Sequence, residues 1–224
     1  MGKLYIIATP IGNLEDITLR ALRTLKEVDL VLCEDTRETR KLLDKYEIKK
    51  PTLSYHQHSK LQKIQQIIEL LRNGKNLALV SDAGTPAISD PGGKLVEEVL
   101  RMFGEEAEII PIPGPTAVAT AASISGFPTD KFLFLGFPPH KHGRAAFFKK
   151  IDATEETVIF YESTHRILKS LEELRTAAGE RQIAVCRELT KMFETIYRGT
   201  VSEVLEKLKA GTTKGEFVVV VGKK

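Results

Sequence analysis

The sequence is poor in cysteine and contains no pattern suited to a structural metal ion. Cys33 and Cys186 are its only cysteines, and each lies in a short apolar run without a CxxC or Cys/His spacing that could bind zinc. The five histidines form no obvious metal-binding set. We therefore expect two buried thiols, no metal ion and a reducing, cytoplasmic location.

Long hydrophobic runs and a strong charge of one sign are lacking too. The longest apolar runs, such as residues 217–221, are far too short to cross a bilayer, and the amino terminus leads into a strand pattern without a charged and apolar leader. Net charge is only +3. No membrane partner is therefore expected, and a polyanion would have to be bound by a local cluster of basic residues.

Apolar runs alternate with amphipathic segments in the first half. Strands are predicted at residues 3–8, 30–33, 77–80 and 109–112, and one of the helices between them is expected to begin at Ser59. This alternation favours a largely parallel sheet flanked by helices. The first strand is not followed by a GxGxxG turn, which argues against an NAD-binding domain.

The second half predicts a mixed-sheet α+β domain with fewer helices. Its expected strands are residues 132–137, 157–161, 182–186, 196–200 and 217–221. The segment PIPGP, residues 111–115, is the natural boundary. We therefore predict two α/β domains, 1–113 and 114–224, with a ligand cleft between them.

The most informative segment is LALVSDAGTPAISDPGG, residues 77–93, in which an apolar run leads into a loop of Gly, Pro, Ser and Asp. Small residues let the backbone approach a ligand closely, and Asp82 adds a carboxylate where open α/β sheets bind their ligands. The alternative is a Gly/Pro-rich surface turn. Similar loops follow the other predicted strands of this half, which favours a binding site.

Two polar segments each allow two interpretations. Arg37 in the EDTR segment is either a phosphate ligand or part of a solvated helix start, where acidic residues are favoured by the helix dipole. His56 and His58 lie two residues apart, so on a strand they would share one face. They either contact RNA or make ordinary packing and turn hydrogen bonds.

The segment PPHKHGRAAFFKK, residues 138–150, combines basic side chains with Phe147 and Phe148. Basic groups that bind phosphates, beside an aromatic ring that stacks on an unpaired base, are typical of single-stranded RNA binding. Alternatively, the two phenylalanines form the core face of a helix and the lysines its solvated side. Arg166, Arg187 and Lys191 follow strands of the second half and are expected to extend the same basic surface.

The motifs LYIIATPIGNLEDIT, VLCEDTR, SYHQHS, LVSDAGTPAISDPG, IPGPTAV and VIFYESTHR together resemble the tetrapyrrole methylase superfamily of S-adenosylmethionine enzymes. Within it, the chain is similar to a group that methylates small-subunit ribosomal RNA. The resemblance spans nearly the whole chain. Longer members continue into a helical extension beyond the final strand, and RNA contacts made there are not expected from this sequence.

The resemblance implies methyl transfer to the ribose 2′-hydroxyl of a cytidine in the decoding region of 16S rRNA. It further implies a homodimer that holds S-adenosylmethionine in the cleft between two α/β domains and acts on free rRNA or the small ribosomal subunit. The alternatives are methylation of a tetrapyrrole carbon and a non-catalytic RNA- or nucleotide-binding module. Incubation with labelled methyl donor separates the three.

Site residues are carried over from the matching motifs or chosen for their chemistry. The positions that the resemblance assigns to the cofactor are Pro10, Ile11, Gly12, Asp82, Ala83, Gly84, Thr85, Thr116, Ala117, Tyr161, Glu162, Gly215, Glu216 and Phe217. Because a ribose hydroxyl needs a proton acceptor, the unranked catalytic candidates are Glu34, Asp35 and Glu162, with Asp82 and His56 also plausible. The RNA-binding candidates are Arg37, His56, His58, His140, Lys141, Arg144 and Lys149.

Overall fold

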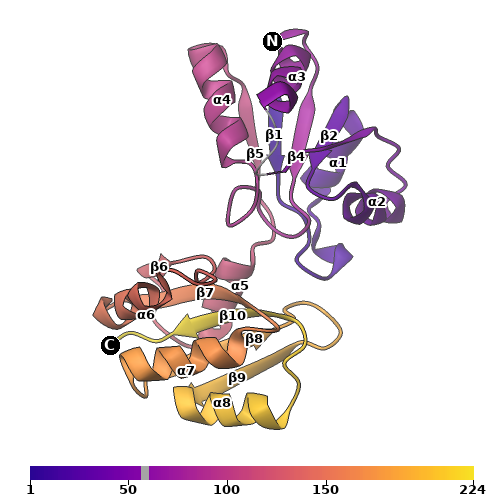
Figure 1. Ribbon diagram of the computed structural model, residues 1–224. Coiled ribbons are helices and arrows are strands. Elements are labelled where there is room, and N and C mark those ends of the chain that lie inside the picture. Colours follow the sequence, from indigo (N-terminus) through magenta and orange to yellow (C-terminus); the bar gives the residue numbers. More distant parts are fainter. Residues whose placement is uncertain (57–60) are drawn as a thin grey trace. The chain divides into compact units, whose positions relative to one another are not determined.

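The computed structural model describes residues 1–56 and 61–224. The chain forms two compact units, Met1–Thr116 and Ala117–Lys224, each with its own sheet and helices (Figure 1). The division lies between residues 116 and 117, whereas the sequence placed it between 113 and 114. In the part of the chain that is described, no helix is long and apolar enough to cross a membrane.

Unit 1 contains a five-stranded sheet in the order β3-β2-β4-β1-β5. All its neighbouring strands are parallel. Their carboxyl ends therefore lie at one edge, where the loops that follow them meet. The strands are β1 (Leu4–Ile7), β2 (Leu30–Cys33), β3 (Thr52–Ser54), β4 (Leu77–Val80) and β5 (Ile109–Ile112).

Helices cover both faces of this sheet, as the alternation predicted. Apolar side chains of α1 (Leu19–Glu27) and α2 (Thr36–Lys45) pack with Val31, Ala78 and Val80 on one face. On the other face, α3 (Leu61–Arg72) and α4 (Gly93–Phe103) pack with Leu32, Leu77 and Leu79. Strand residues thus alternate between two apolar layers, which buries the sheet on both sides. Two short 3-10 helices, η1 (Leu14–Asp16) and η2 (Gly104–Glu106), complete the unit.

Strand β3 was missed from the sequence because it has only three residues and lies at the sheet edge. The expected start of a helix at Ser59 lies outside the described residues, as does His58. His56 follows the end of β3 and is not part of a strand, so the expectation of a strand face shared by two histidines does not hold for it.

Unit 2 contains a mixed sheet in the order β6-β7-β10-β8-β9, as expected. β6 and β7 are parallel, and the other neighbours are antiparallel. As a result β6, β7 and β8 point the same way and end at the same edge. The strands are β6 (Phe132–Phe134), β7 (Thr157–Ser163), β8 (Gln182–Arg187), β9 (Thr195–Thr200) and β10 (Glu216–Val221).

The prediction of fewer helices in the second half was wrong: the described residues contain four α-helices in each unit. α6 (Arg144–Ala153), α7 (Ile167–Ala178) and α8 (Val201–Ala210) pack on one face of the sheet around Phe160, Val185 and Phe217. α5 (Ala117–Ser125) contacts β7, β8 and β10. Its sequence, AVATAASIS, lacks a polar stripe, which is why it did not show helical periodicity.

Candidate active site

The loops after β1 and β4 are joined at the carboxyl edge of unit 1. Thr9 and Gly84 exchange two backbone hydrogen bonds, with N···O distances of 2.9 and 3.0 Å, and Thr9 Oγ1 also donates to the carbonyl of Ser81 at 2.9 Å. The loop after β5 joins them, because Thr85 Oγ1 donates to the carbonyl of Pro115 at 3.2 Å. Three of the glycine- and proline-rich turns therefore form one connected surface.

Gly84 is required by the shape of this surface. Its φ of +87° lies in the left-handed region, and a Cβ atom there would lie 3.4 Å from the Cγ2 atom of Ile11. Pro10 and Ile11 are buried at this point, whereas Gly12 and Ala83 are exposed. Backbone groups of the β1 and β4 loops thus approach each other without an intervening side chain.

Ser81 was not singled out from the sequence. It is 3% exposed at the carboxyl end of β4, and its Oγ atom has no hydrogen-bond partner among the described residues. A buried hydroxyl without a partner is costly in a folded protein and is typical of a position that meets a ligand or an ordered water.

A polar cavity of about 450 Å³ lies beside these loops, at the carboxyl ends of β2, β3 and β4. Every described residue that lines it has a charged, hydroxyl or imidazole side chain. The cavity brings together four of the predicted proton acceptors, all but Glu162. The lining residues are Glu34, Asp35, Thr36, Arg37, Ser54, His56 and Asp82.

Asp35 has a structural role in this cavity. Its Oδ1 atom accepts a hydrogen bond from the backbone N of Arg37 at 2.8 Å, which caps α2, and its Oδ2 atom pairs with the Arg37 guanidinium at 2.6 Å. Hydrogen bonding to Arg37 lowers the pKa of Asp35 to about 2. A carboxylate this acidic accepts protons poorly, and Arg37, the predicted phosphate ligand, is paired with it.

Glu34 and Asp82 have the opposite electrostatics. Partial burial, reinforced by the charge of Asp82, raises the pKa of Glu34 above its usual value. Partial burial is also the main cause of the raised pKa of Asp82, whose Oδ1 atom accepts the backbone N–H of Asp35 at 3.0 Å. Raised carboxyl pKa values are typical of general bases, because they bring proton affinity closer to neutral pH.

His56 lies on the wall of the same cavity. Its Nε2 atom is 2.7 Å from Ser54 Oγ. Its predicted contact with RNA stays a prediction, and for His58 the described residues give no information.

Glu162 lies in unit 2, in a buried ion-pair network. Its side chain is fully buried and pairs with Arg166 at 2.9 Å, and its carboxylate accepts hydrogen bonds from the hydroxyl groups of Ser163 and Ser170. Arg166 also donates to the carbonyl of Pro138 at 3.1 Å. A carboxylate this enclosed has no room for a ribose hydroxyl, so this placement favours a structural role over the predicted catalytic one.

Arg144, predicted to contact RNA, belongs to the same network. It is 7% exposed, donates to Ser170 Oγ and to the carbonyl of Pro139, and pairs with Glu173. Its guanidinium is therefore not available to a phosphate. By contrast, His140, Lys141 and Lys149 are exposed, as their RNA-binding prediction requires.

Phe147 and Phe148 pack in the core of unit 2, so the core-helix interpretation of this segment is correct for them. Arg187 is likewise buried. The predicted stacking partner for an unpaired base is therefore absent from α6.

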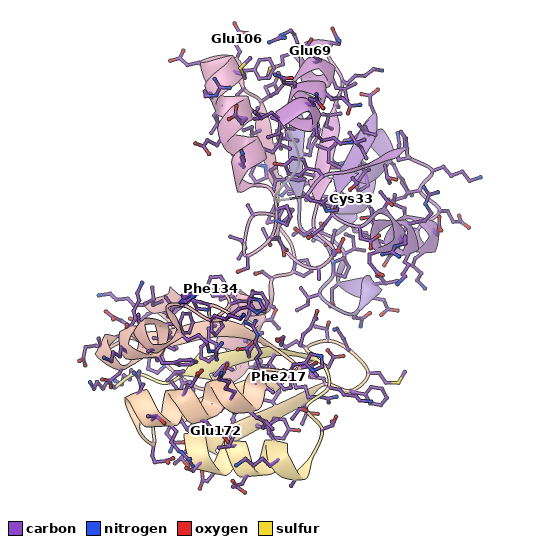
Figure 2. All side chains as sticks on the ribbon, in the orientation of Figure 1. Cys33, Glu69, Glu106, Phe134, Glu172 and Phe217 are labelled. Carbon is purple, nitrogen blue, oxygen red and sulfur yellow. The ribbon has the colours of Figure 1, made fainter. Side chains whose placement is uncertain are left out.

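The remaining cofactor positions of unit 2 are neighbours on its sheet. Phe217 lies opposite Glu162. Thr164 Oγ1 donates to the carbonyl of Gly215 at 2.7 Å and accepts the backbone N–H of Gly215 at 2.8 Å. Phe217 is buried at the start of β10 (Figure 2), whereas Glu216 is exposed. The role of Tyr161 and of residues 215–217 in cofactor binding stays a prediction, as does that of Thr116 and Ala117.

Solved structures share this fold. A diphthine synthase matches with a TM-score of 0.75 at 14% identity, covering 99% of this chain and 90% of the other. A uroporphyrin-III-C-methyltransferase from Thermus thermophilus matches with a TM-score of 0.68 at 22% identity, covering 100% and 95%. The family model of Tetrapyrrole (Corrin/Porphyrin) Methylases matches residues 3–205. The chain is thus an S-adenosylmethionine-dependent methyltransferase, and it belongs to the tetrapyrrole methylase family.

Two curated relatives are more similar in sequence. A protein named ribosomal RNA small subunit methyltransferase I from Thermotoga maritima is 46% identical over 224 residues, which cover the whole of both chains. A protein of the same name from Bacillus subtilis is 46% identical over 222 residues, which cover 99% of this chain and 75% of the relative.

Proposed function

We propose that this methyltransferase modifies 16S rRNA of the small ribosomal subunit, on the ribose 2′-hydroxyl of a cytidine in the decoding region. The observation that carries the proposal is the polar lining of the cavity around Glu34. A ribose hydroxyl needs hydrogen-bonding groups and a proton acceptor, both of which this lining offers. Methylation of a tetrapyrrole carbon would instead need a wide apolar acceptor site.

The loops at the carboxyl edge of unit 1 have the chemistry to hold the methyl donor. Gly84 leaves backbone groups accessible, and the unpartnered Ser81 hydroxyl is suited to a hydroxyl or amino group of the cofactor. Among the described residues that line the cavity, the carboxylates of Glu34, Asp35 and Asp82 outnumber the one cation, Arg37, which favours a positively charged sulfonium nearby. When bound, S-adenosylmethionine supplies the methyl group on that sulfonium.

Among the three candidates, Glu34 suits the role of general base best. Asp35 is too acidic and is paired with Arg37, while Glu162 is enclosed by its own network. Asp82, whose pKa is also raised, already accepts the backbone N–H of Asp35 at 3.0 Å. Glu34 would accept the 2′-hydroxyl proton as the ribose oxygen forms its bond to the methyl carbon and the carbon–sulfur bond breaks, so that the sulfur leaves as a neutral thioether. Positioning of the two reactants is expected to contribute more to the rate than this proton transfer.

The test is methyl transfer from labelled S-adenosylmethionine to 16S rRNA, free and in assembled small subunits, with a porphyrinoid as the competing acceptor. Glu34→Gln should lower kcat by about 10² to 10⁴. Since Glu34 must be ionised to accept a proton, the wild-type rate should fall as the pH drops through the raised pKa of Glu34, and the variant should lack this decline.

Glu69→Gln is a matched control. Glu69 is an exposed carboxylate near the end of α3 (Figure 2). This end of α3 lies beside the amino end of β1, because the carbonyl of Leu71 accepts the backbone N–H of Gly2, whereas the cavity lies at the carboxyl ends of the strands. This variant should retain full activity. Label in the porphyrinoid alone would contradict the rRNA substrate, while rRNA labelling that is equal in Glu34→Gln and the wild type would exclude Glu34 as the base.

We also propose that the enzyme acts in the cytoplasm as a homodimer. The family resemblance supports the homodimer, and the proposed rRNA substrate supports the cytoplasmic location. Sedimentation velocity of the purified protein tests the dimer, which a single monomer-sized species at micromolar concentration would contradict.

A further inference from the structure

The loop between β8 and β9 exposes two large apolar side chains. Met192 is 91% exposed and Phe193 is 67% exposed. Scattered exposed apolar residues are common, but two adjacent ones of this size at the end of a sheet suggest a contact surface. We call Met192 and Phe193 the β8–β9 tip.

The backbone that carries the tip is firmly held. Arg187, buried at the end of β8, donates to the carbonyl of Phe193 at 2.9 Å and to the carbonyl of Lys214 at 2.6 Å. Lys191 bonds to Glu188 and Glu216, both at 2.9 Å. These contacts hold the loop backbone to β8 and β10, which lowers the entropy cost of ordering the tip when it binds.

Two residues of the loop also adopt a backbone conformation that side chains disfavour. Glu188 has a φ of +53° and Thr190 a φ of +65°, and the backbone N of Thr190 is bonded to Glu194 Oε2 at 2.7 Å. Left-handed backbone at non-glycine residues persists only where neighbouring contacts enforce it. The loop that exposes the β8–β9 tip thus has a strained backbone, which its own contacts maintain.

Strand register places the tip at the same end of the sheet as the exposed basic loop. Phe217 is opposite both Glu162 on β7 and Arg187 on β8, and the backbone N of Tyr161 bonds to the carbonyl of Gly136 just after β6. The loops that follow β6 and β8 therefore leave the sheet at the same end. Three strand spacings separate β6 from β8, so the two loops begin about 15 Å apart.

The loop after β6 carries His140, Lys141 and His142, all exposed, and also Phe137, which is 48% exposed. Lys141 forms no ion pair with any described residue. Around the tip itself, the charges of Arg187, Lys191 and Lys214 are balanced by those of Glu188, Glu194 and Glu216. This end of the sheet thus carries a loop with one lysine and two histidines and, on the other side, an apolar tip whose neighbouring charges balance.

We propose that the β8–β9 tip stacks on an unpaired base of the RNA whose phosphates are bound by the loop after β6. This inference rests on the proposed rRNA substrate and adds the stacking group that Phe147 and Phe148, both in the core, do not supply. Basic side chains that bind phosphates, combined with an aromatic ring that stacks on a base, are the means by which proteins bind single-stranded RNA. The thioether of Met192 adds a polarizable contact to the same base.

The experiment measures binding of a fluorescein-labelled, single-stranded oligonucleotide with the 16S decoding-region sequence by fluorescence anisotropy. Phe193→Ala should weaken binding about 10-fold. Phe193→Trp should keep the wild-type affinity, whereas Phe193→Leu should lose affinity as Phe193→Ala does, because stacking needs a ring and not only apolar area. Phe132→Ala is the matched control: Phe132 is 42% exposed at the start of β6, at the opposite end of the same sheet, and its loss should leave affinity unchanged.

Two further measurements keep the inference separate from the proposed function. The affinity for S-adenosylmethionine, by calorimetry, and the melting temperature should be unchanged in Phe193→Ala. Equal RNA affinity of wild type and Phe193→Ala would overturn the inference, as would a shift of Phe193→Ala to smaller species in sedimentation, which would assign the tip to a second copy of the chain. Failure of the wild type to methylate rRNA would overturn the substrate itself.

Discussion

At the scale of single residues, the left-handed glycines of this chain differ in what surrounds them. Gly84 has a φ of +87° and lies against Ile11 in the candidate site, while Gly74 has a φ of +79° and would place a Cβ atom in open space. The backbone cost of a side chain is thus similar at both positions, but only one of them is close to the proposed methyl donor.

We expect Gly84→Ala and Gly74→Ala each to lower the free energy of unfolding by about 1 to 2 kcal/mol, because alanine is strained in this backbone conformation. Only Gly84→Ala should weaken S-adenosylmethionine binding, measured by calorimetry. If the two variants bound the cofactor equally well, the β4 loop would not form part of its site.

At the scale of elements, β7 and α7 are joined by the buried carboxylate of Glu162. Glu162→Gln keeps the shape of the side chain but leaves the Arg166 guanidinium without its buried counter-charge. Unfolding by urea should show a loss of about 3 kcal/mol. Glu172→Gln is the comparison, since Glu172 is an exposed residue of α7 whose partner Lys209, 3.7 Å away, is exposed as well, and its loss should cost about 1 kcal/mol or less.

Glu162→Gln also distinguishes a structural role of Glu162 from a catalytic one. If the role of Glu162 is structural, the variant should have a lower free energy of unfolding but keep the wild-type kcat at a temperature where it is folded. Lost kcat with wild-type stability would instead return Glu162 to the list of proton acceptors.

At the scale of the whole molecule, a net charge of +3 means that RNA affinity must come from local cations. Lys141→Ala should therefore make the slope of log K against log salt concentration less steep by about 0.7, the value for one cation on single-stranded nucleic acid. Lys75→Ala is the control, because Lys75 is paired with Asp29 at 3.0 Å. Identical slopes for wild type and Lys141→Ala would exclude Lys141 as a phosphate contact.

Patterns within short segments were sufficient to predict much of the fold. The parallel sheet of unit 1 and the mixed sheet of unit 2 follow from apolar runs with strand and helix periods, which depend only on near neighbours in the chain. The three-residue β3 and the uniformly apolar α5 escaped because neither has a period long enough to recognise. The loops after the strands were recognisable from their Gly and Pro content alone.

The candidate site could be predicted as a region but not as a set of roles. The sequence by itself was enough to recognise the family, from its motifs, and the polar segments after the strands, which include Glu34 and Asp82. Only the tertiary structure decided that Arg144 and Glu162 are buried partners, that Asp35 caps a helix and that Phe193 is exposed. A charged side chain has the same local signature whether it faces solvent or a counter-charge, because its partner comes from a distant segment that only strand register and helix packing bring beside it.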